Sequence, residues 1–194
     1  MVATCDDIKS YHPSVPEDAR SLGELRADFL ESSTVSMPIA GILFWIAATV
    51  ASRFLDPKAL AYFVGFGSGT VFPLGLIFDR LRGRTKLADN RSPITQLFLQ
   101  SLAMVALMWP LVILAGSVSP GLVVLGGNIL MGLVWIPYGW AANDPVGLRH
   151  TLFRTIASYV MFVFVPAPFR LTMVCAVPVA AYFYSFMAMR KPQL

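Results

Sequence analysis

The residue best placed to do chemistry inside an apolar stretch of this chain is Asn128, the only amide well inside such a run. On a helix, Gly132, Trp135, Gly139 and Asn143 would follow it on the same face. That face carries small, polar and aromatic residues, which suit contact with a neighbouring helix or a cavity better than contact with lipid. A lone amide in a membrane span usually hydrogen-bonds across helices. The alternative is contact with a ligand or a pore, and both interpretations stay open.

A second group lies in the glycine-rich segment 65–70, which contains Ser68 and Thr70. Gly65 and Gly69 are four residues apart, a spacing that lets two helix backbones approach closely. The alternative is a locally unwound segment that lines a binding site. No charged residue accompanies the segment, which favours plain packing. The candidate cavity residues of these two groups are Ser68, Thr70, Asn128, Gly132 and Trp135.

A third group lies where the fourth apolar run gives way to the fifth, at the predicted cytoplasmic mouth of the bundle. It combines an indole, an amide, an acid, an imidazole and a guanidinium: Trp140, Asn143, Asp144, His150 and Arg154. Arg154 lies about two turns into the fifth run, so its side chain would extend back to the headgroups. The alternative pairs it with Asp144 or Asp79, which would make a site of mixed acid and base chemistry.

Residue types and motifs that the sequence lacks exclude several classes of function. From residue 35 onward the chain has no glutamate, and its aspartates fall outside the centres of the apolar runs, which disfavours carriers that need an intramembrane carboxylate. It has no CxxC, Cys/His cluster, HExxH or phosphate-cradling loop, so we expect no metal or cofactor residues. No histidine occupies the centre of a later span as a base for a serine hydrolase. We therefore expect no catalytic residues of these kinds.

Composition indicates a membrane protein with several spans. Of 194 residues, 56% are hydrophobic and 13% are charged, about half the charged share of soluble domains. The length allows about six spans of about 20 residues and little else. Six apolar runs lie near 35–52, 59–78, 95–116, 121–141, 148–166 and 169–189. The last two are separated only by residues 165–170, which predicts a tight hairpin. The alternative is a single broken helix and five spans.

The first 34 residues differ from the rest of the chain. They hold seven acids and three bases and lack the apolar core of a signal peptide. Ser14 and Glu17 make a capping box, and apolar residues then recur at helical spacing as far as Phe29. We therefore predict an all-α protein: an acidic cytoplasmic tail with a short amphipathic helix over 1–34, and a polytopic bundle of about six transmembrane helices over 35–190.

The basic residues predict the orientation of the chain. With six spans, the side that carries the amino terminus collects twelve lysines and arginines, and the opposite side collects only Arg53, Lys58 and Arg170. The positive-inside rule then places both termini in the cytoplasm of a plasma (inner) membrane. Residues Arg80–Arg91 would contact anionic lipid headgroups. The alternative is that the acidic amino-terminal helix docks on this basic loop. The positive charge lies beside the apolar runs, and this position argues against nucleic acid as a partner.

Four short apolar motifs carry a resemblance to a known group. They are Ile42–Trp45, Phe72–Gly75 (the FPLG pattern), Trp109–Leu111 and Pro137–Trp140 (the PYGW pattern). Through them the chain resembles a group of uncharacterised small bacterial multi-spanning membrane proteins over roughly residues 36–190. The resemblance implies membrane location and span count. It implies no activity, because none is established for the group.

These observations favour a non-enzymatic membrane protein that binds or passes a neutral or apolar small molecule or lipid. Its second and fourth helices would line the cavity. One competing hypothesis is an accessory or scaffold subunit that recruits a partner through its polar cytoplasmic face. Another is a membrane enzyme that uses Arg154, His150 and Asp144. A monomer or a symmetric homo-oligomer would each suit a chain of this size.

Overall fold

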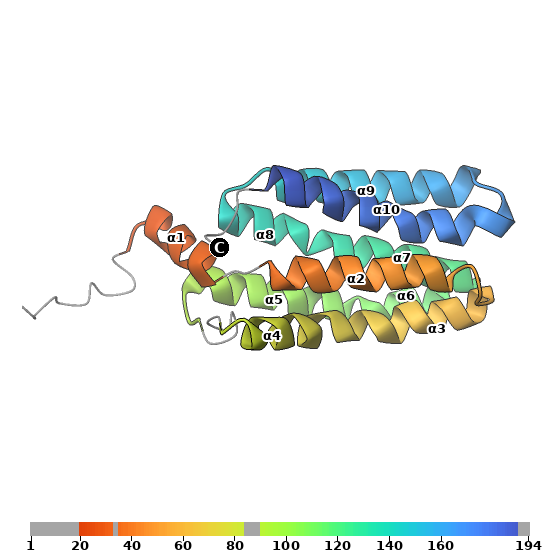
Figure 1. Ribbon diagram of the computed structural model, residues 1–194, viewed down its shortest axis with the longest axis horizontal. Coiled ribbons are helices and arrows are strands. Elements are labelled where there is room, and N and C mark those ends of the chain that lie inside the picture. Colours follow the sequence, from red (N-terminus) through yellow and green to blue (C-terminus); the bar gives the residue numbers. More distant parts are fainter. Residues whose placement is uncertain (1–19, 33–34, 84–89, 190–194) are drawn as a thin grey trace, which may run out of the picture.

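The computed structural model describes residues 20–32, 35–83 and 90–189, which are helical or lie in short turns, with no strand among them (Figure 1). The elements are α1 (Leu22–Ser32), α2 (Ser36–Ala51), α3 (Pro57–Gly67), the 3-10 turn η2 (Ser68–Thr70), α4 (Val71–Leu81), α5 (Pro93–Leu107), α6 (Trp109–Ala115), α7 (Pro120–Leu133), α8 (Trp135–Ala142), α9 (Val146–Phe164) and α10 (Ala167–Ala188). The predicted all-α fold is confirmed.

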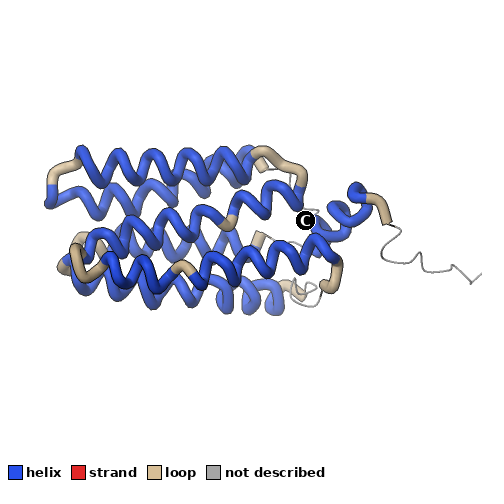
Figure 2. The backbone as a smooth tube through the Cα atoms, turned by 180° about the vertical axis from the view of Figure 1, so that it is seen from behind, coloured by secondary structure: helices blue, strands red, loops and turns tan. Residues whose placement is uncertain are grey.

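Several of these helices follow one another end to end and form longer segments. α3, η2 and α4 make one segment, α5 and α6 a second, and α7 and α8 a third. Together with α2, α9 and α10, these segments run back and forth along the long axis of the molecule (Figures 1 and 2). They match the positions of the six predicted apolar runs. α9 and α10 lie side by side, so the hairpin predicted at 165–170 is present rather than one broken helix.

Within the described ranges, four helical segments are long and apolar enough to cross a membrane: Pro57–Leu81, Pro93–Ala115, Pro120–Ala142 and Ala167–Ala188. The count rises to five if α1 and α2, a bent pair, form one span. α9 falls outside both counts because Arg149, His150 and Arg154 lower its mean hydropathy. Length and composition therefore support a membrane protein with four or five spans, where the sequence predicted about six.

Prolines explain why two of the segments are interrupted. Pro110 has no N–H to donate to Ala106, and α5 ends at the next residue, Leu107. Pro137 likewise leaves the carbonyl of Leu133 without its helical donor, and α7 ends there. Each break therefore occurs within one turn of the carbonyl that the proline leaves unpaired.

Helix α1 packs across the end of the bundle against α5 and α8. Its start is a capping box in which the Ser21 backbone N–H donates to the Glu24 carboxylate at 2.7 Å. The box predicted at Ser14 and Glu17 lies outside the described residues. Phe29 is fully buried, and its ring meets Phe98 and Tyr138 at centroid distances of 5.5 and 6.0 Å. α1 therefore packs against the bundle through its apolar side.

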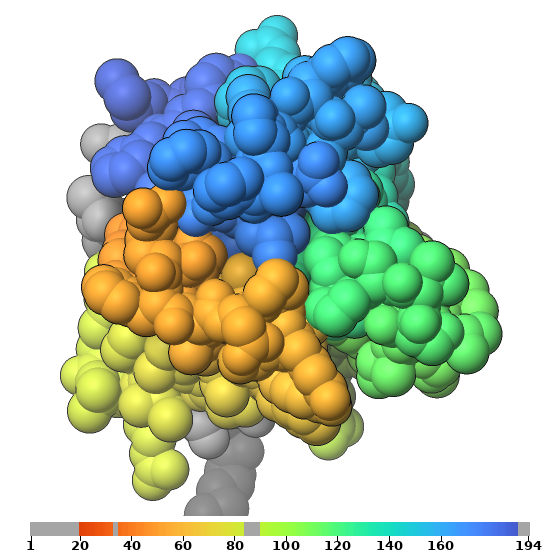
Figure 3. All heavy atoms as spheres, turned by 90° about the vertical axis from the view of Figure 1, so that its right-hand side faces the viewer, coloured from red at the N-terminus to blue at the C-terminus, as the bar shows by residue number. Residues whose placement is uncertain are grey.

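The segment formed by α7 and α8 lies at the centre of the bundle. Half of the residues in its most apolar 18-residue stretch are buried. In the segment of α5 and α6 the corresponding share is 11%, so that segment is peripheral. At the end opposite α1, the turns before α3, before α7 and before α10 are visible together in orange, green and blue (Figure 3). The central segment carries Asn128 and Trp135, so both residues are held among several neighbouring helices.

Candidate functional site: a buried arginine–asparagine network beside an apolar cleft

Asn128 lies fully buried on α7 and connects three helices through its amide. Its Nδ2 donates to Ser158 Oγ on α9 at 3.0 Å and to the carbonyl of Val174 on α10 at 2.7 Å. Its Oδ1 accepts a hydrogen bond from Nε of Arg154 at 2.7 Å. The amide therefore has partners on both its donor and its acceptor side, as a buried polar group requires.

A proline on α10 explains why Asn128 finds a backbone carbonyl there. In an unbroken helix the carbonyl of Val174 would accept from the N–H of residue 178, but that residue is Pro178. The Asn128 amide supplies the missing donor. In lipid, a freed backbone carbonyl needs such a replacement, because no water can supply one.

Arg154 on α9 extends into the bundle and is fully buried. Its guanidinium carbon lies 5.0 Å from the ring centre of Trp45 and 5.8 Å from that of Tyr182. Gly132 makes room for the side chain, since a Cβ there would lie 2.9 Å from Arg154 Cδ. Cation–π contacts and the Asn128 hydrogen bond thus stabilise the buried charge.

The described part of the chain offers Arg154 no ion pair. Neither Nη1 nor Nη2 has a hydrogen-bond acceptor among the described residues. The phenol of Tyr182 interacts electrostatically with the guanidinium, but no hydrogen bond of ordinary geometry joins them. The structure thus differs from both expected arrangements, extension to the headgroups and pairing with Asp144 or Asp79, because inward aromatic and amide partners hold the side chain.

His150 lies one turn before Arg154 on the same helix and is also buried. Its ring stacks on Trp135 with centroids 4.2 Å apart. Its Nδ1 lies 2.8 Å from Ser185 Oγ, and the Ser185 hydroxyl donates to the carbonyl of Ala181 at 3.0 Å. Because that hydroxyl proton is already used, we assign the His150 proton to Nδ1. Nε2 has no hydrogen-bond partner within the described ranges.

The residues predicted to line a cavity fall into different places. Ser68 and Trp135 line a cleft, described below. The exposed Thr70 hydroxyl donates to the carbonyl of Gly67 in its own helix. Gly132 lies against Arg154 and Asn128 belongs to the network, so neither is among the residues that line that cleft.

The residues predicted to gather at the cytoplasmic mouth are also separated. Trp140 is half exposed, with the guanidinium of Arg26 over its ring. Asn143 ends α8 in the left-handed conformation, with a φ of 52°, and Asp144 accepts a hydrogen bond from the N–H of Val146 at the start of α9. His150 and Arg154 lie inside the bundle instead. The structure therefore joins one member of each predicted group: Arg154 with Asn128, and His150 with Trp135.

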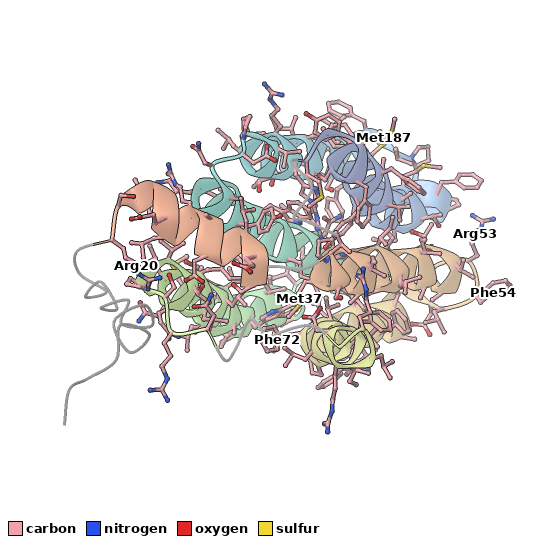
Figure 4. All side chains as sticks on the ribbon, turned by 60° about the vertical axis from the view of Figure 1, so that its left-hand side comes forward. Arg20, Met37, Arg53, Phe54, Phe72 and Met187 are labelled. Atoms are coloured by element: carbon pink, nitrogen blue, oxygen red, sulfur yellow. The ribbon has the colours of Figure 1, made fainter. Side chains whose placement is uncertain are left out.

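A largely apolar cleft of about 470 Å³ lies between α4 and α5, and the buried Asp79 is among the residues that line it. α4 packs on α2, and α5 packs on α1 and α8, so direct helix contact does not close the space between them. Met37 and Phe72, which lie next to each other in Figure 4, form part of its wall. The wall also includes Gly69, where a Cβ would meet no atom within 4 Å. Gly69 therefore borders open space rather than the close helix contact that its spacing suggested.

The floor of the cleft is aromatic and separates it from the buried network. Trp135 and Tyr182 both line the cleft and are almost fully buried. On its other side Trp135 stacks on His150, while the Tyr182 ring lies near both His150 and Arg154. Neither Trp45 nor Tyr182 was predicted as a site residue. The sequence did contain one indication of a polar contact on α10. Pro178 leaves a backbone carbonyl of this helix without its donor, and Tyr182 lies on the same helix.

The model of a family of unknown function, DUF7010, matches residues 22–191. The chain belongs to this family. The DUF7010 match includes α1, which the resemblance drawn from short motifs left out. No curated protein and no solved structure matches the chain.

Proposed function

We propose that this protein binds a neutral or apolar small molecule, or a lipid chain, in the cleft between α4 and α5. The observation that carries the proposal is the cleft itself. Its volume of about 470 Å³ falls within the range of about 300–1,000 Å³ that is usual for small-molecule pockets. Its rim includes exposed Gly69, Phe72 and Ala106, and its floor is buried and aromatic. In a membrane, such a rim would face the acyl chains.

Photolabelling tests this binding. A diazirine-bearing dodecanol should label the protein saturably, with cross-links to residues of the cleft wall such as Phe72 and Ala106. Gly69→Leu places a side chain in the open space and should reduce saturable labelling about tenfold, the effect of losing about 1.4 kcal/mol of binding free energy. Mapped peptides and competition by unlabelled dodecanol provide the measurement.

An alanine pair provides the matched control for filling the cleft. Ala106 lines the cleft, whereas Ala47 is exposed on α2 and is not part of its lining. Ala106→Leu should reduce labelling as Gly69→Leu does, and Ala47→Leu should leave it unchanged. Equal labelling of all three variants and the original chain would remove the basis for a binding function at this site.

We also propose that both termini are cytoplasmic and that the membrane is the plasma (inner) membrane. The predicted charge asymmetry supports this orientation, with Arg80 and Arg82 at the end of α4 facing anionic headgroups. Phe54, in the turn between α2 and α3 at the opposite end of the molecule, is 83% exposed (Figure 4). This turn would then face the exterior.

Cysteine labelling tests the orientation. In a Cys5→Ser background, Phe54→Cys should react with a membrane-impermeant maleimide in intact cells. The native Cys5 should react only after the cells are permeabilised. Cys175 is buried and should remain silent in both experiments. Reaction of Cys5 in intact cells would reverse the proposed orientation.

A further inference from the structure

Arg154 introduces a positive charge that the surrounding protein does not neutralise. Its side chain is fully buried, and no carboxylate of the described residues pairs with it. The Asn128 hydrogen bond occupies Nε, and the two terminal nitrogens have no protein acceptor in the part of the chain that the structure describes. Charged groups inside membrane proteins are costly and usually mark a functional site or its counter-ion. The missing complement is an anion.

Tyr182 connects this charge to the cleft. Tyr182 lines the cleft, and its ring centre lies 5.8 Å from the guanidinium carbon of Arg154. Its hydroxyl lies against Gly41, where a Cβ would collide with it. Tyr182 is therefore part of both the cleft wall and the surroundings of the Arg154 guanidinium.

We propose that Arg154 binds the acidic headgroup of a single-chain amphiphile whose apolar chain lies in the cleft. This inference rests on the function proposed above and defines the class of its ligand. The planar guanidinium presents two terminal N–H groups side by side, the arrangement that holds a carboxylate through two hydrogen bonds. One cation is neutralised by one anionic group, so the headgroup is a monoanion. This arrangement requires the Tyr182 ring to move aside as the headgroup approaches.

Competition among three ligands with the same chain length tests this assignment without altering the protein. Dodecanoate, methyl dodecanoate and dodecyltrimethylammonium are each added against the dodecanol photolabel. Dodecanoate should compete at a concentration about tenfold below that of its ester, which corresponds to about 1.4 kcal/mol. The cation should compete least. Equal competition by the acid and the ester would overturn the assignment while leaving the cleft as a binding site.

Variants locate the headgroup. Arg154→Gln should abolish the difference between dodecanoate and its ester, and Arg154→Lys should retain part of it because the charge remains. Arg170→Gln is the matched control, since Arg170 lies over Phe162 at the start of α10 and is not part of the cleft. A preference for the acid that survives Arg154→Gln would refute the role of Arg154. Absence of saturable labelling in the unaltered chain would instead refute the proposed function.

Discussion

Gly147→Val is expected to prevent α8 and α9 from packing and to destabilise the protein by about 3 kcal/mol or more, at the upper end of overpacking costs. A Cβ at Gly147 would collide with the carbonyl oxygen of Trp135 and lie 2.7 Å from the Cα of Gly139. Both obstacles are backbone atoms, which no rotamer change can move. The helices would have to separate, and the Trp135–His150 stack would separate with them.

Gly69→Val is the matched control for that substitution, because both glycines lie in helical segments and a Cβ at Gly69 meets no atom within 4 Å. Unfolding in mixed micelles at increasing SDS concentration measures both variants. Gly69→Val should remain within about 1 kcal/mol of the original chain, since the steric cost is absent and helix propensity changes little. Equal losses for the two glycines would contradict the close approach of α8 and α9.

Asn128→Leu is expected to cost about 3 kcal/mol, because it leaves a buried charged donor and a buried carbonyl without partners. Arg154 would lose the acceptor for its Nε, and the Val174 carbonyl would lose the side-chain donor that replaces the N–H missing at Pro178. Gln100→Leu is the control, since it removes an exposed amide from α5. It should change the free energy of unfolding by less than about 0.5 kcal/mol.

A double-mutant cycle with Pro178→Ala tests the reason for the Asn128–Val174 hydrogen bond. Alanine at position 178 restores the backbone N–H that donates to Val174, so the carbonyl no longer depends on Asn128. Asn128→Leu should then cost about 1 kcal/mol less than it does beside Pro178, the size of an interhelical hydrogen bond in a membrane. The same cost in both backgrounds would show that Pro178 and Asn128 act independently.

The helical segments were predictable because they depend on local properties. Apolar runs long enough for a membrane, and prolines that lack an N–H, are visible in the sequence without knowledge of any neighbour. Pro110 and Pro137 lie beside the breaks after α5 and α7 for this reason. The span count was less predictable, because the charged residues of α9 lower its hydropathy while the helix still packs alongside α10.

The candidate site was only partly predictable because its contacts join distant parts of the chain. Asn128 was identified from its isolation in an apolar run, and its interhelical hydrogen bonds follow the commoner interpretation of such a residue. The direction of the Arg154 side chain depends on Trp45, Asn128 and Tyr182, which belong to three other helices. Nothing local to α9 distinguishes an inward from an outward arginine. The cleft likewise depends on the contacts of α4 and α5 with other helices, which leave a space between the two.

The position of α1 has a consequence for biosynthesis. Phe29 is made early, yet the rings that cover it belong to Phe98 and Tyr138. During translation this helix must therefore wait, with its aromatic side chain uncovered, until the ribosome has passed residue 138. A helix made early in synthesis is consequently completed by parts of the chain that are made later.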